Sequence, residues 1–246
     1  MGLSFNVSDR TALTPGLTTE ADWLAFARSS LSHTDKDIHA PLPACPQLPM
    51  MTARRLNSGS RLAVNCGLEM LRRHPDVGAI VFSSRHGELE RNHRILSELA
   101  TQTPVSPTNF TMSVHNAAVG SLAIIAKSVI PASSVSAGKD SFQQGLYEAS
   151  ALLHSGHQCV LFVDFDGIIP GIYHDVLPDG KPFPPYACAL ILTPGNQWQC
   201  SPQPSAGVSV DNNELPQSLQ FYSGLISEKR RFTVTGDTHL WHWQNN

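Results

Sequence analysis

The residues from 133 to 156, SSVSAGKDSFQQGLYEASALLHSG, have the pattern of a short strand, a glycine turn and a helix. Many enzymes place a nucleophile at such a turn, because the unpaired N–H groups at the start of the helix stabilise negative charge. Two side chains here could serve as that nucleophile, Ser136 and Lys139. The residue types therefore make acyl transfer or Schiff-base formation the candidate reactions.

Lys139 has surroundings that disfavour a nucleophile. A lysine ammonium has a reference pKa of about 10.4, so it is protonated near neutral pH and cannot attack a thioester. Burial or a nearby cation would lower that pKa, but the neighbour in the sequence is Asp140, and a carboxylate favours the charged form. A cation at a helix amino terminus also opposes the helix dipole by about 0.3–1 kcal/mol. These effects favour a residue that serves packing or an ion pair with a partner, and a catalytic lysine is the alternative.

Other residues that could do chemistry form weaker patterns. SVSAG places Ser136 between small residues but lacks the G-x-S-x-G motif of a hydrolase. The 11 histidines show no metal-binding spacing such as H-E-x-x-H. Asp164 and Asp166 in VDFDG could bind magnesium at the end of a strand, but we interpret them as turn-forming residues. We therefore expect no metal and no cofactor.

Strands and helices alternate from about residue 53 to residue 193. Apolar runs predict buried strands over 77–84, 132–137, 159–166 and 187–194, and helical spacing predicts helices over 53–74, 87–102, 113–129 and 140–155. Strands that alternate with helices form right-handed βαβ units. The predicted fold class is α/β, with a mixed, mainly parallel sheet and helices on both faces.

The helices carry different amounts of apolar surface. Four apolar residues share one face of the last helix: Phe142, Leu146, Ala149 and Leu153. The helix over 87–102 has its leucines on one side, and the helix over 113–129 is apolar around its circumference, so we expect most of its faces to be covered. The segment 167–186 is rich in proline and glycine and predicts a surface loop, whereas the chain beyond residue 194 is polar and proline-spaced.

Composition excludes several classes of function. Charged residues make up 15% of the chain, against about 25% in ordinary soluble domains, so a large surface that a partner covers would fit. A net charge of −3 disfavours nucleic-acid binding and a polybasic membrane anchor. The most apolar stretch is broken by Lys127 and Pro131, so we expect no membrane span and a cytoplasmic protein. The five cysteines form no C-x-x-C pair, and Cys159 and Cys188 are expected as core residues.

The order of elements resembles the amino-terminal half of a β-ketoacyl synthase, which has the thiolase fold. The segments that carry the resemblance are RRLNSGSRLAVNCGLEML, VGAIVFSS, NAAVGSLAIIAK, the strand–turn–helix and VLFVDFD, with GLTTEADWLAF near the start. Alignment at Ser141 and Gly156 places Lys139 at the acyl-accepting cysteine, so the family signature Thr-Ala-Cys-Ser-Ser reads AGKDS here. The resemblance covers residues 3–193 and predicts a domain over 1–193, with 194–246 as an extension that packs on it.

The resemblance implies that this chain does not catalyse. Ketosynthases perform a Claisen condensation with a thiolate and with histidines that come from the second half of the fold. Residues 194–246 contain neither an HGTxT-like nor an NHxxG-like segment. The nearest candidates, His239 and His242, are expected in an ordinary packed or interfacial aromatic tail.

As a ketosynthase-like subunit without the cysteine, this chain resembles the chain-length factors of type II polyketide systems. Those subunits pair with an active ketosynthase and shape its acyl channel. The short chain resembles the truncated chain-length factors of aryl-polyene clusters. It departs from the better-known members, which carry glutamine at the cysteine position and keep both halves of the fold. The partners implied are a full-length β-ketoacyl synthase, in a heterodimer, and an acyl carrier protein that binds the complex transiently.

The thiolase fold consists of two halves, so a chain that forms only one of them leaves apolar surface uncovered. The helix over 114–129, the strand over 132–137 and the low charge predict a large, obligate heterodimer interface, with a homodimer as the competing arrangement. The interface or channel candidates are Val114, His115, Asn116, Ser133, Val135, Ser136, Lys139, Asp140 and Phe142. The alternative function is a stand-alone acyl-transferring enzyme that uses Lys139 or Ser136.

Overall fold

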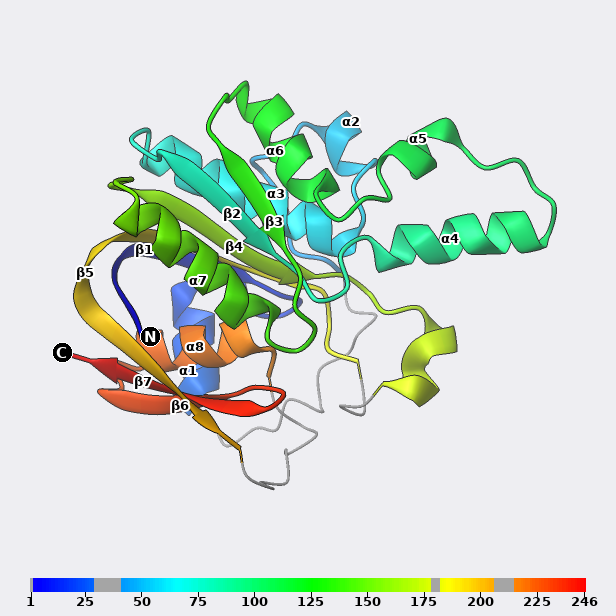
Figure 1. Ribbon diagram of the computed structural model, residues 1–246. Helices are drawn as coiled ribbons and strands as arrows, with labels where there is room; N and C mark the ends of the chain where they lie inside the picture. The colour runs from blue at the N-terminus through cyan, green and yellow to red at the C-terminus, as the bar shows by residue number, and fades with distance from the viewer. Residues whose placement is uncertain (1, 29–40, 178–181, 206–214) are drawn as a thin grey trace.

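The computed structural model describes residues 2–28, 41–177, 182–205 and 215–246. In these residues one seven-stranded sheet runs in the order β3-β2-β4-β5-β7-β6, and β1 also pairs with β5 (Figure 1). The strands are β1 (Leu3–Leu13), β2 (Ala79–Ser83), β3 (Ala132–Val135), β4 (Val160–Asp166), β5 (Tyr186–Pro204), β6 (Arg231–Thr235) and β7 (His239–Asn245). The β2–β3 and β2–β4 ladders are parallel, and the other ladders are antiparallel.

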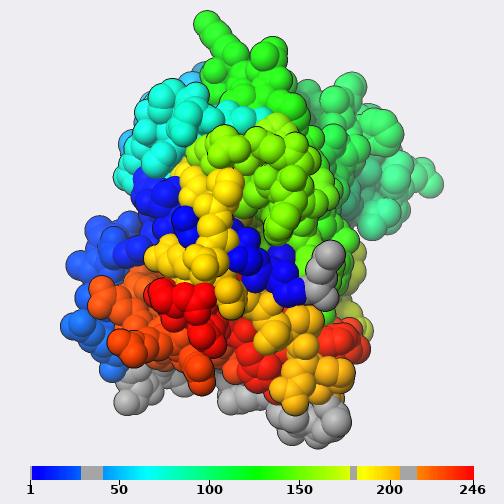
Figure 2. All heavy atoms as spheres, turned by 60° about the vertical axis from the view of Figure 1, so that its left-hand side comes forward, coloured from blue at the N-terminus to red at the C-terminus, as the bar shows by residue number. Residues whose placement is uncertain are grey.

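The α/β fold class and the mixed sheet are confirmed, but the antiparallel part is larger than the sequence predicts. The strand expected over 187–194 continues to Pro204, and its second half pairs with β7. The polar chain beyond residue 194, for which no element was predicted, also contains helix α8 (Gln217–Ile226) and strands β6 and β7. In the space-filling view these carboxy-terminal elements adjoin β1 and β5 in one continuous surface (Figure 2).

Helices cover both faces of the sheet, as predicted. The bounds of those that cover it are α1 (Glu20–Arg28), α3 (Ser58–Arg73), α6 (Ala117–Ala126), α7 (Ser141–His154) and α8. Alternate residues of β4 belong to two separate cores, because successive side chains of a strand point to opposite faces. Phe162 packs in the core with α1, α7 and α8, whereas Leu161 and Val163 pack in the core with α3 and α6.

The remaining helices project from the body of the molecule (Figure 1). They are α2 (Met50–Ala53), α4 (Leu89–Ala100), α5 (Pro107–Thr111) and the 3-10 helix η2 (Gly171–Val176). The side of α4 that carries its leucines is largely uncovered, because Leu96 and Leu99 are 56% and 59% exposed. Helix α6 is covered on one side only, since Leu122 is buried and Ile124 is 79% exposed. Helix η2 lies in the predicted loop, of which 178–181 fall outside the described residues.

Cys159 and Cys188 are buried in the core, as predicted. Burial raises the pKa of the Cys159 thiol to about 11, so the thiolate that a reactive cysteine needs is disfavoured. In the part of the chain that the structure describes, no helix combines the length and the apolar character needed to cross a bilayer.

Candidate functional site

The predicted strand, glycine turn and helix are present as β3, the turn over 136–140 and α7. Gly138 has a φ of +58°, a conformation that other residues rarely adopt, and a Cβ placed there would contact nothing within 4 Å. Ser141 braces the turn from within, because its Oγ accepts a hydrogen bond from the Ala137 amide at 2.9 Å and donates one to the Gly138 carbonyl at 2.7 Å. The turn is therefore ordered by its own residues and open on its outer side.

The two candidate nucleophiles lie on this turn with different exposure. Ser136 is exposed, and its Oγ donates to the backbone carbonyl of Arg85 at 3.5 Å. A backbone carbonyl cannot act as a general base, so the serine is not arranged as an activated nucleophile. Lys139 is half-buried at the last turn position before Asp140.

Asp140 is held by the carboxy-terminal part of the chain. Its carboxylate accepts hydrogen bonds from Gln217 Nε2 at 2.7 Å and from Trp241 Nε1 at 3.1 Å. The next residue but one, Phe142, is 2% exposed and packs against Phe162 and Phe221 with ring centroids 5.5 and 5.6 Å apart. Phe142 thus lies in the core, and its part in an interface or channel stays a prediction.

The other candidates from the sequence lie along the β3 edge. His115 is fixed between two strands, since its Nε2 donates to the Ser84 carbonyl at 3.0 Å and its Nδ1 lies 2.8 Å from Ser134 Oγ. Val114 is 50% exposed and Asn116 is exposed beside it. The last two interface or channel candidates lie in β3 itself.

Those two members of β3 are partly covered. Val135 is half-buried and packs against the core that contains α7. Ser133 Oγ is buried and has no hydrogen-bond partner among the described residues. The structure thus brings the predicted candidates to one end of the sheet, at β3 and the segments that flank it, and Phe142 alone among them is buried in the core.

Sequence reasoning missed a buried polar cluster at the end of β4. Asp164 and Asp166 lie inside the strand, so their interpretation as turn-forming residues is wrong. Asp164 accepts a hydrogen bond from Ser83 Oγ at 2.6 Å, and Tyr186 OH donates to Asp164 at 3.3 Å. Burial raises the pKa of Asp164 to about 7. The signal in the sequence was the period-two spacing of the two aspartates at the end of an apolar run.

The aspartate cluster is not arranged as a metal centre. Asp166 accepts from Ser84 Oγ at 2.6 Å and from the His86 amide at 2.8 Å, so protein donors already surround it. Across the described ranges, no group of three or more His, Cys, Asp or Glu side chains could hold a metal ion.

A second buried cluster anchors the projecting helix α4. Glu88, just before α4, accepts hydrogen bonds from Asn57 Nδ2 at 2.8 Å and from Ser60 Oγ. Arg91 lies 3.4 Å from Glu88 and donates to the Arg55 carbonyl at 2.7 Å. Burial raises the pKa of Glu88. These contacts join the base of α4 to the segment in front of α3 and to the start of that helix.

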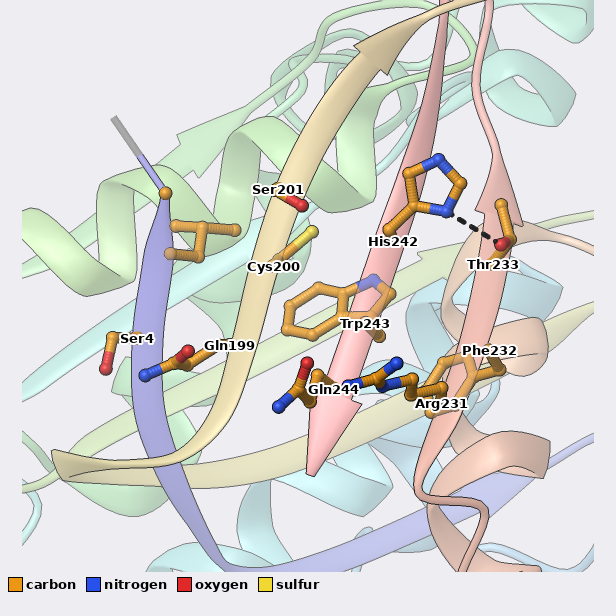
Figure 3. A pocket seen from close by; sticks show the side chains of 12 residues that line it. Ser4, Gln199, Cys200, Ser201, Arg231, Phe232, Thr233, His242, Trp243 and Gln244 are labelled. Atoms are coloured by element: carbon orange, nitrogen blue, oxygen red, sulfur yellow. Dashed lines mark hydrogen bonds between the residues drawn. The ribbon is translucent and has the colours of Figure 1, made fainter. Parts of the chain in front are cut away.

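A hollow of about 760 Å³ opens on the outer face of the sheet, away from the β3 edge (Figure 3). It is lined by Gly2, Leu3, Ser4, Gln199, Cys200, Ser201, Arg231, Phe232, Thr233, His242, Trp243 and Gln244. His242 is hydrogen-bonded to Thr233 and to Gln203, both at 3.0 Å. It is thus held by neutral side chains of the same sheet and is not paired with Ser136.

The sheet, its two helical layers and the turn ahead of α7 define a thiolase-like fold of the ketosynthase amino-terminal type. The family described as "Beta-ketoacyl synthase, N-terminal domain" matches residues 23–244, and the chain belongs to this family. The match extends past residue 193, where the resemblance seen in the sequence ended. The division into 1–193 and 194–246 stays a prediction.

Solved structures of ketosynthases and chain length factors also match this chain. A structure described as the ketosynthase ApeO in complex with its chain length factor ApeC from Xenorhabdus doucetiae matches with 52% identity and a TM-score of 0.91, covering 99% of this chain and 100% of that one. The ishigamide ketosynthase/chain length factor matches with 12% identity and a TM-score of 0.76, over 98% and 99% of the two chains.

A β-ketoacyl synthase from Burkholderia phymatum shares the fold at 11% identity and a TM-score of 0.60, over 93% of this chain and 71% of that one. No curated protein matches the sequence.

Proposed function

We propose that this chain is a non-catalytic chain-length-factor subunit that pairs with an active β-ketoacyl synthase and shapes its acyl channel. The setting is type II fatty-acid or polyketide biosynthesis of the aryl-polyene kind. The 52% identity to a chain from a ketosynthase–chain length factor complex, over nearly the full length of both chains, supports this assignment.

The turn ahead of α7 supports a subunit without chemistry of its own. Lys139 occupies the position that the resemblance gives to the acyl-accepting cysteine. Ser136 has a backbone carbonyl as its hydrogen-bond partner. His115, the histidine that flanks β3, is bound to Ser134 and to the Ser84 carbonyl, so it is held in a structural contact.

The distribution of exposed apolar side chains is the observation that best supports pairing with a ketosynthase. Ten large hydrophobic residues are exposed in the described chain: Met50, Met51, Leu96, Leu99, Phe110, Val114, Ile124, Val129, Ile172 and Val176. All of them belong to α2, α4, α5, α6, η2 or the segments next to these elements, and the described residues from 182 onward contribute none. Exposed apolar side chains that are concentrated on one set of elements indicate a protein interface.

An open strand edge lies next to one of these elements, α6. Among the described strands β3 pairs with β2 alone and ends the sheet (Figure 1). An open edge offers backbone N–H and C=O groups to another chain. The partner is the cognate full-length ketosynthase, in a heterodimer, and an acyl carrier protein reaches the chain transiently as part of that complex.

The test is co-expression with the cognate ketosynthase, followed by size-exclusion chromatography with light scattering. We expect a stable 1:1 complex, and poorly soluble or self-associated protein when the chain is expressed alone. Ile124→Asp should weaken the complex, because it places a charge on an exposed apolar position of α6. The matched control, Thr233→Asp on the exposed outer face of β6, should leave it intact. A monomer that ignores the ketosynthase, or a homodimer that excludes it, contradicts the proposal.

A further inference from the structure

Asp140 occupies the N-cap position of α7 but does not cap that helix. An aspartate at this position ordinarily accepts a hydrogen bond from an N–H group in the first turn of its own helix. The Asp140 side chain makes no such bond. Its Oδ1 instead accepts from Gln217 Nε2 at 2.7 Å and from Trp241 Nε1 at 3.1 Å, and the Asp237 amide lies 3.3 Å from Oδ2.

The three donors come from three parts of the carboxy-terminal segment 215–245. Gln217 begins α8, Asp237 lies between β6 and β7, and Trp241 lies in β7. These parts are also tied to each other. Gln217 Nε2 donates to the Thr235 carbonyl at 3.0 Å, and the Thr235 amide donates to Gln220 Oε1 at 3.1 Å.

The fit around the carboxylate is tight. A Cβ on Gly236 would lie 2.4 Å from Asp140 Oδ1 and 2.5 Å from Trp241 Nε1, so any larger residue would displace the contact. On the other side of the turn, Ser141 bonds to Ala137 and to Gly138. The turn over 136–140 is thus held between its own helix and the carboxy-terminal segment.

We propose that Asp140 is a positioning residue through which the segment 215–245 sets the place of the turn over 136–140. The turn follows the open edge strand β3, and Ser136, Ala137 and Gly138 are exposed. By fixing the turn, Asp140 fixes how Ser136 and Lys139 are presented to the ketosynthase and therefore how far the acyl channel extends. This inference rests on the proposed function.

The test uses the complex with the ketosynthase and compares a graded set of variants. Asp140→Ala removes both acceptor oxygens, whereas Asp140→Asn keeps Oδ1 for Gln217 and Trp241 and gives up only the 3.3 Å contact of Oδ2 with the Asp237 amide. Trp241→Phe removes one donor and keeps an aromatic ring. The control Leu225→Ala loosens the buried face of α8, where Leu225 is 6% exposed, without touching the carboxylate.

Three measurements are made on each variant: complex formation by size-exclusion chromatography, the indole N–H resonance of Trp241 by NMR, and the distribution of product chain lengths by mass spectrometry. We expect Asp140→Ala and Trp241→Phe to form the complex and to shift the distribution of product lengths. Asp140→Asn and Leu225→Ala should keep the wild-type distribution. The Trp241 indole resonance should shift in Asp140→Ala and stay near its wild-type position in Asp140→Asn.

The outcomes separate the two proposals. A wild-type chain that does not pair with the ketosynthase refutes the proposed function. Paired Asp140→Ala with an unchanged distribution of product lengths overturns the positioning role and leaves the pairing intact. If Asp140→Ala does not assemble, Trp241→Phe decides by the same criterion. An equal shift in Leu225→Ala also overturns the role, because it shows that loosening the segment away from the carboxylate has the same effect.

Discussion

Replacement of Asp164 by asparagine should stabilise the chain above neutral pH. The carboxyl group is 3% exposed and lies beside Asp166, with hydrogen bonds from Ser83 and Tyr186. Burial, reinforced by the charge of Asp166, raises its pKa from 3.8 to about 7. The folded chain therefore favours the protonated acid, whereas the unfolded chain ionises at the ordinary pKa. Asparagine is the neutral side chain of nearly the same shape.

The magnitude follows from the difference between the two pKa values. One pKa unit corresponds to about 1.4 kcal/mol, so a shift of about 3 units corresponds to about 4 kcal/mol. A raised acid pKa means that the folded state binds more protons, so the free energy of unfolding falls as pH rises. This contribution is fully present below pH 3.8, is lost between 3.8 and about 7, and is absent at higher pH.

The Asp164→Asn variant lacks this pH dependence. At pH 8 it should be more stable than the wild type by up to about 4 kcal/mol, less about 1 kcal/mol because an amide N–H₂ replaces one acceptor oxygen. The assay is urea unfolding of the dilute isolated chain between pH 5 and pH 8, followed by the fluorescence of its buried tryptophans. Glu228→Gln, which removes an exposed carboxylate, is the control. Equal pH slopes in the wild type and in Asp164→Asn would refute the reasoning.

Two further predictions concern Lys139 and the base of α4. In the reconstituted pair, Lys139→Ala should leave acyl loading of the ketosynthase cysteine and a single condensation largely intact, and should instead change product length or complex stability. Lys139→Cys should create no second condensing site. Mass spectrometry of acyl adducts and turnover assays check both variants. If the isolated wild-type chain turns over substrate and Lys139→Ala abolishes that activity, the lysine is a catalyst. Arg91→Ala should lower the free energy of unfolding by about 3–5 kcal/mol, because it leaves the buried Glu88 carboxylate unpaired. The exposed neighbour Arg94, changed to Ala, should cost less than about 0.5 kcal/mol in the same unfolding assay, and equal losses in the two variants would argue against a structural ion pair.

The sequence predicts those elements whose pattern is local. Helix α7 repeats apolar residues at helical spacing, and β4 begins with an apolar run, Val160 to Val163, that is buried on both faces, so both were recognised within a few residues. Strands β1 and β7 are different, because their burial depends on β5. The β1–β5 ladder joins Leu3 to Cys200, and no pattern within either strand predicts so distant a pairing.

For the candidate site, too, the sequence predicts the local features and misses the distant contacts. The turn over 136–140 follows from Gly138 and from the onset of α7, so its place in the chain could be predicted. The role of Asp140 could not, because its hydrogen-bond donors are 77 and 101 residues away. The sequence shows an aspartate at a helix start, which is typical of a cap, and only the packed chain shows that its carboxylate points elsewhere.

The two ends of the sheet differ in chemistry, and this difference limits how the chain can assemble. At the β3 end the flanking residues Ile124 and Val129 are exposed and apolar. At the β6 end of the described sheet the exposed residues include Lys229, Arg230 and Arg231. Charged side chains beside an edge strand discourage pairing with another strand, because docking would have to desolvate them. Of the two ends of the strand order β3-β2-β4-β5-β7-β6, the β3 end therefore favours pairing and the β6 end disfavours it, which suits a pair closed by a single partner better than a filament in which β3 of one copy meets β6 of the next.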